Sequence, residues 1–139
     1  MNNQEFFTAA LLHCRKQGIA SIDNSGNCKY RGPNRLACAV GGILTDEEVQ
    51  QVEVERGNIE GGTASFVLGY VPRLGNVSRG LADSIQAAHD HLMPAPGFID
   101  VDATLPDPGR YGFAERSLAN FNTRMREIAN SYGLVFTEA

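Results

Sequence analysis

Apolar residues recur at helical spacing in three stretches of this 139-residue chain, and this periodicity constrains its fold more than any other feature. Residues three, four and seven positions apart share one face of an α-helix, so such a stretch predicts a helix that buries that face. The predicted helices cover residues 3–17, 77–92 and 113–131. Their apolar faces consist of Phe7, Ala10, Leu11 and Cys14, then Leu81, Ile85, Ala88 and Leu92, then Leu118, Phe121, Met125, Ile128 and Tyr132.

A fourth helix is predicted from its start signal. Thr45 to Glu48 reads Thr-Asp-Glu-Glu, a capping box in which Thr45 and Glu48 each bond the other's backbone N–H. This helix is expected to end by Arg56–Gly57. Gly18 and Gly133 stand where a glycine ends a helix in the left-handed conformation.

Turn residues on both sides of two short runs predict a β-hairpin, with strands near 28–31 and 36–40. Residues 134–136 predict a closing strand, whereas residues 66–71 fit a strand or a helical turn equally well. Residues 93–112 form a long loop rich in proline and glycine. We therefore expect a single α+β domain over 1–139, with a small antiparallel sheet packed by about four helices.

Composition and charge exclude several classes of protein. The net charge of −4 argues against a nucleic-acid binder, which usually has a basic excess. No apolar run approaches the roughly 20 residues that span a bilayer, and the first residues do not resemble a signal peptide. Three cysteines without a CxxC spacing are typical of free thiols in a reducing cytosol.

The acidic residues are concentrated between Thr45 and Glu60, where Arg56 is the single basic residue. This concentration has two interpretations. It is either a solvated face of the predicted helix or an acidic patch that docks on a basic partner. The acidic residues of the stretch are Asp46, Glu47, Glu48, Glu53, Glu55 and Glu60.

Cys38, His89 and Asp90 are the candidate catalytic residues. A thiol, an imidazole and a carboxylate that orients the ring are the parts of a cysteine-dependent enzyme, and Asp100 or Asp102 could also supply the carboxylate. The alternative is that Cys38 is a buried thiol that packs as a small apolar side chain. The Cys and His spacings do not predict a metal site, and no sequence motif predicts a cofactor.

Several short motifs, in order along most of the chain, resemble a family of small uncharacterised bacteriophage and prophage proteins. The matching residues are Tyr30, Arg31, Cys38, Ala39, Val40, Gly41, Asp46, Glu47, Ile85, Gln86, His89 and Asp90. The chain departs from the family pattern at Gly42 and Thr45. The resemblance implies a phage accessory protein and carries over no catalytic residue. The candidate binding residues are Tyr30, Arg31, Asp46, Glu47 and Gln86.

The leading functional hypothesis is a non-enzymatic protein of the host cytoplasm that binds a host or phage protein, with inhibition of host defence or regulation as one role of that binding. A small cysteine-dependent enzyme that uses Cys38 and His89 is the first alternative. The second alternative is a protein that sequesters a small ligand, with the 93–112 loop as its lid. The sequence leaves the partner and the oligomeric state open.

Overall fold

The computed structural model describes residues 1–21, 29–32, 35–92 and 113–137, and the regular elements within these ranges are helices. In chain order they are α1 (Asn3–Gln17), α2 (Asp46–Arg56), the 3-10 helix η2 (Ile59–Gly61), α3 (Ala64–Leu68), the 3-10 helix η3 (Pro72–Leu74), α4 (Arg79–His89) and α5 (Phe113–Tyr132). The predicted loop at 93–112 and Cys28 lie outside the described residues. Within those residues, no helix combines the length and apolar character required to cross a bilayer.

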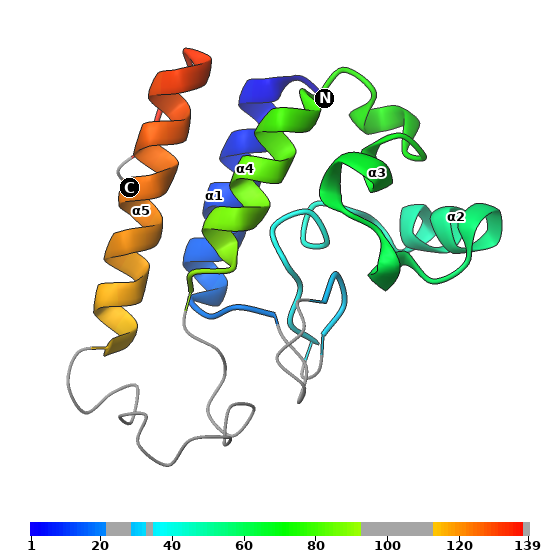
Figure 1. The fold of residues 1–139 in the computed structure, drawn as a ribbon, viewed down its shortest axis with the longest axis horizontal. Coiled ribbons are helices and arrows are strands. Elements are labelled where there is room, and N and C mark those ends of the chain that lie inside the picture. The colour runs from blue at the N-terminus through cyan, green and yellow to red at the C-terminus, as the bar shows by residue number, and fades with distance from the viewer. Residues whose placement is uncertain (22–28, 33–34, 93–112, 138–139) are drawn as a thin grey trace.

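Helix α4 is the element around which the others pack. It contacts α1, α3 and α5, and α1 also contacts α5. In Figure 1, α1, α4 and α5 run alongside one another, α3 lies on the other side of α4, and α2 lies at the edge farthest from α5. The four residues predicted for the apolar face of the first helix are fully buried, as are Leu81 and Ile85 of α4. The helical periodicity therefore predicted this part of the core correctly.

The ends of the helices follow from local chemistry. The Thr45 side chain accepts the Glu48 N–H and the Glu48 side chain accepts the Thr45 N–H, so the predicted capping box is confirmed. A second capping box, between Asn2 and Glu5, begins α1. Gly18 ends α1 with a φ of 73°, in the left-handed region where glycine carries no steric penalty.

The predicted α+β fold is wrong for the described residues, which contain no sheet. The predicted hairpin fails because residues 37–40 are all buried, so the alternation of large and small residues does not separate an inner from an outer face. The backbone instead turns helically, since the N–H of Gly42 bonds the carbonyl of Cys38 and that of Leu44 bonds the carbonyl of Val40. Short apolar runs do not distinguish strand from helical turn by periodicity.

The predicted closing strand at 134–136 is also wrong. This segment has no regular secondary structure and no partner strand among the described residues. The side-chain amide of Gln4 takes that place, because it donates to the Val135 carbonyl and accepts the Val135 N–H. Residues 66–71, whose sequence fitted a strand or a helical turn equally well, contribute to α3 and to the turn that follows it.

Candidate functional site

Four separate segments line a small hollow that contains half of the sequence-predicted site residues, namely Tyr30, Cys38, Gln86 and Asp90. We define this Cys38 hollow by Tyr30, Cys38, Glu60, Asp83, Gln86 and Asp90, and its volume is about 260 Å³. Tyr30 and Cys38 come from the two irregular segments before α2, and Glu60 comes from η2. Asp83 and Gln86 lie on α4, and Asp90 caps its C-terminal end. Ala64 and Ala87 add apolar wall, so the hollow has a largely apolar interior beneath three carboxylates.

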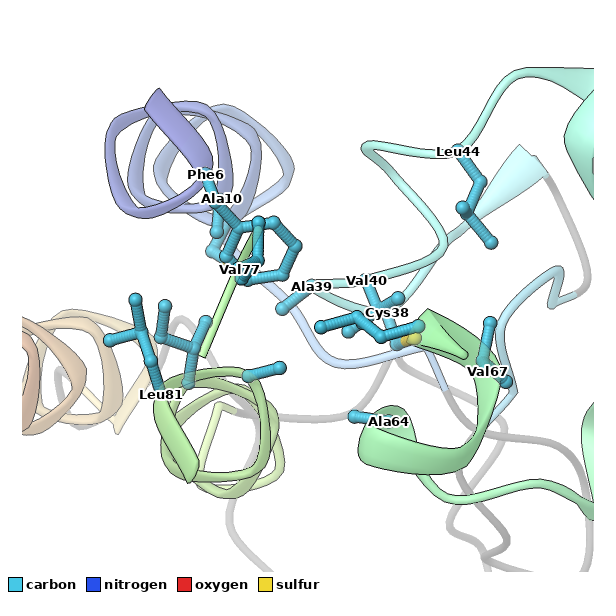
Figure 2. Close-up of a cluster of buried hydrophobic side chains, with 14 of the residues drawn as sticks. Phe6, Ala10, Cys38, Ala39, Val40, Leu44, Ala64, Val67, Val77 and Leu81 are labelled. Atoms are coloured by element: carbon cyan, nitrogen blue, oxygen red, sulfur yellow. The ribbon is translucent and has the colours of Figure 1, made fainter. Parts of the chain in front are cut away.

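Cys38 is part of the core as well as of the hollow. Its side chain is 1% exposed and belongs to the same cluster as Val40 and the α3 residues Ala64 and Val67 (Figure 2). Its Sγ accepts a hydrogen bond from the Gly41 N–H at 3.3 Å. The thiol therefore supports the turn over residues 38–41, as expected for a buried cysteine that packs.

Gly41 allows two segments of backbone to approach closely at the hollow. A Cβ at this position would lie 2.0 Å from the carbonyl oxygen of Tyr30, far inside van der Waals contact. Tyr30 is held in turn, because its N–H donates to Glu60 and its hydroxyl donates to the Gly62 carbonyl at 2.7 Å. The Cys-Ala-Val-Gly stretch thus fixes one wall of the hollow.

On α4, Gln86, His89 and Asp90 form one hydrogen-bonded network. Gln86 accepts the Val40 N–H with its side-chain oxygen and donates to Asp90 Oδ1 at 3.2 Å with its side-chain nitrogen. His89 Nδ1 lies 3.0 Å from the same carboxylate oxygen. The network joins α4 to the loop that carries Cys38.

His89 has a structural role in this arrangement. The ring is fully buried, and its Nε2 accepts the N–H of Ser21 at 3.1 Å, which places the ring proton on Nδ1 facing Asp90. A general base for Cys38 would need a free ring nitrogen within reach of the thiol. Both nitrogens of His89 instead have partners other than Cys38, so the predicted Cys38–His89 pair is not assembled as a catalytic pair.

Two acidic residues of the hollow were not predicted. Glu60 accepts the N–H groups of Tyr30 and Arg31, and Asp83 accepts the N–H of Ser65 at 3.0 Å. Asp83 precedes Asp90 by seven residues and therefore shares its face of α4. The seven-residue spacing could have predicted that Asp83 lies on the same side of the helix as Asp90. Nothing in the sequence, in contrast, places Glu60 beside Tyr30.

The remaining predicted binding residues lie at the start of α2 and not in the hollow. Arg31 forms an ion pair with Asp46 at 3.3 Å and donates to the Leu44 carbonyl, so this pair ties the Tyr30 segment to α2. Glu47 is exposed. Both partners of the ion pair are solvent-accessible, so its contribution to stability is small.

The other titratable groups with shifted pKa values have structural causes. Burial, and to a smaller extent the negative charge of Asp90, raises the pKa of the Cys14 thiol to about 12. The hydrogen bond from Arg73 lowers the pKa of Glu48. Among the described residues, no three His, Cys, Asp or Glu side chains are placed to hold a metal ion. Searches of protein-family models, curated proteins and solved structures find no match to this chain.

Proposed function

We propose that this chain is a phage-encoded accessory protein that binds a host or phage protein, and that the Cys38 hollow receives one basic side chain of that partner. The observation that carries the proposal is the combination of an apolar interior with three carboxylates at one small hollow. Lysine and arginine have the complementary form, an apolar stem with a charged end. The resemblance to phage and prophage proteins supports the origin.

The size of the hollow favours a single side chain. Pockets that hold whole small-molecule ligands measure roughly 300–1,000 Å³. The Cys38 hollow, at about 260 Å³, falls below that range. A cofactor or a drug-sized substrate would not be enclosed, whereas the end of one long side chain would be.

Charge favours a cation. The described residues that line the hollow include Glu60, Asp83 and Asp90 and no basic side chain. An ionised carboxylate accepts about four hydrogen bonds. Glu60 and Asp83 each use part of that capacity on backbone N–H groups, which fixes their positions and leaves acceptor sites for a donor cation.

Comparative capture of partners from a bacterial lysate tests this function. The bait proteins are the wild type, Asp83→Asn, and Glu127→Gln as a control that removes the same charge from exposed α5. Asparagine can still accept the Ser65 N–H, so the fold is retained. We expect at least one protein to be retained by the wild type and Glu127→Gln and lost with Asp83→Asn. Equal retention by all three baits, or no specific retention, would contradict the proposal.

A further inference from the structure

Helix α2 is held to the rest of the molecule by a narrow contact. Val49 and Val52 are its buried residues, and most of its other side chains are exposed. It carries five acidic side chains and one arginine, a net charge of −4, which equals the net charge of the whole chain. The remainder of the protein is therefore neutral in sum, and α2 is the source of its net negative charge.

The outward face of α2 contains an apolar residue that the fold does not cover. Val54 is 86% exposed. Gln50 and Gln51 lie one helical turn before it and Glu47 lies two turns before it, so all four residues occupy the same face of α2. Glu53 and Glu55 adjoin Val54 in the chain and are exposed as well. An apolar side chain bordered by carboxylates is the pattern found where a partner's apolar contact is surrounded by charge pairs.

A second hollow lies directly beside this face. Its volume is about 300 Å³, and we define this α2 hollow by Gln51 and Glu55 on α2 and by Leu68, Val71, Leu74, Val77 and Arg79 from the segments beside it. The four apolar side chains of this lining are buried. Glu55 therefore borders both the outward face of α2 and the hollow. On this surface Val54 offers the apolar contact and the carboxylates of α2 offer the negative charge, whereas Arg79 contributes a positive charge to the lining of the hollow.

We propose that the outward face of α2 and the α2 hollow form a docking surface for a basic amphipathic segment of a partner protein. The segment would cover Val54 with an apolar side chain and direct its cations toward Glu53 and Glu55, at the α2 edge of the hollow. Charge complementarity selects this occupant over a second copy of the chain, because two α2 faces with the same negative charge repel each other. The inference rests on the proposed function, protein binding, but concerns a surface separate from the Cys38 hollow.

The test uses a synthetic peptide with lysine and leucine at helical spacing, a scrambled peptide of the same composition, and a peptide with glutamine replacing lysine. Affinities are measured by fluorescence anisotropy, and the contact site is mapped by amide NMR shifts. The proteins are the wild type, Glu55→Lys, and Glu127→Lys as a matched reversal on α5. Because Glu55 lies in the last turn of α2, where a cation suits the helix dipole, the variant keeps its fold.

We expect the amphipathic peptide to bind the wild type more tightly than either comparison peptide, with shifts at Gln51, Glu55, Val54 and the residues of the α2 hollow. Glu55→Lys should weaken binding about fivefold or more, since attraction is replaced by repulsion, and Glu127→Lys should change it far less. Equal binding of the scrambled peptide, equal loss in both variants, or shifts spread over the whole surface would overturn the proposal. The proposal would also be overturned if sedimentation showed that the free protein dimerises and that Glu55→Lys abolishes the dimer. Such a failure would leave the Cys38 hollow unaffected, because that site is scored by Asp83.

Discussion

Replacing Gly41 by alanine should be among the most damaging single-methyl changes available in the described part of this chain. The new Cβ would lie 2.0 Å from the Tyr30 carbonyl oxygen, whereas ordinary van der Waals contact begins at 3.4 Å. The backbone of residue 30 must therefore move away by about 1.4 Å, the difference between these two distances. That retreat loosens the bonds of Tyr30 to Glu60 and Gly62. Overpacking costs about 1–3 kcal/mol and each lost hydrogen bond about 1 kcal/mol, so we expect a total of about 3 kcal/mol or more.

Gly42→Ala is the matched comparison. A Cβ at Gly42 would lie 2.5 Å from the ring of His13, a half-buried side chain that can turn away and give up its contact of 2.8 Å with the Ala37 carbonyl. The expected cost is about 1 kcal/mol, the value of one hydrogen bond. Urea unfolding followed by circular dichroism measures both variants. Equal costs, or a cost for Gly41→Ala below about 1 kcal/mol, would refute the reasoning from backbone contact.

Three further predictions concern the helices and thiols. Thr45→Ala should lower the free energy of unfolding by about 1 kcal/mol in urea melts, because it removes the acceptor for the Glu48 N–H; an unchanged midpoint would contradict this. Folding lowers the pKa of Glu48 below its ordinary value of 4.5. The ionised Glu48 side chain therefore stabilises the folded protein at pH values above 4.5, and this contribution is lost as the pH falls through the folded-state pKa. Glu48→Gln should therefore flatten the acid limb of the stability-versus-pH curve, and a curve parallel to that of the wild type would count against the Arg73 bond as the cause. Cys14, fully buried with a pKa of about 12, should resist iodoacetamide at neutral pH until urea unfolds the protein, as read by peptide mass spectrometry; rapid labelling of the folded protein would contradict its burial.

Helices α1, α2, α4 and α5 were predictable because their signals are local. Apolar spacing placed α1, α4 and α5, and the Thr45 capping box placed α2, since both depend on residues within a few turns. The helical turn around Cys38, where a strand was wrongly predicted, could not be recognised from the sequence. Alanine and glycine are buried as readily as large apolar residues, so alternation there carried no information about which side faced solvent.

The candidate site was predicted in part. Tyr30, Cys38, Gln86 and Asp90 were named separately from the sequence, and the structure places all four in the lining of one hollow. The role of His89 differed, because its partner Ser21 is distant in sequence and no local pattern reveals that bond. Glu60 joins the site through contacts to the Tyr30 segment that depend on the tertiary fold.

An NMR titration of the Cys38 hollow tests the central claim most directly. The probes are N-acetyl-arginine methylamide and its uncharged isostere, N-acetyl-citrulline methylamide, added to the wild type, Asp83→Asn and Glu127→Gln. We expect saturable shifts at Ala64, Gln86 and Ala87 with the arginine probe, much smaller shifts with the citrulline probe, and weaker arginine binding by Asp83→Asn than by Glu127→Gln. Equal responses to the two probes, or no saturable shift at these residues, would contradict a hollow that receives a basic side chain.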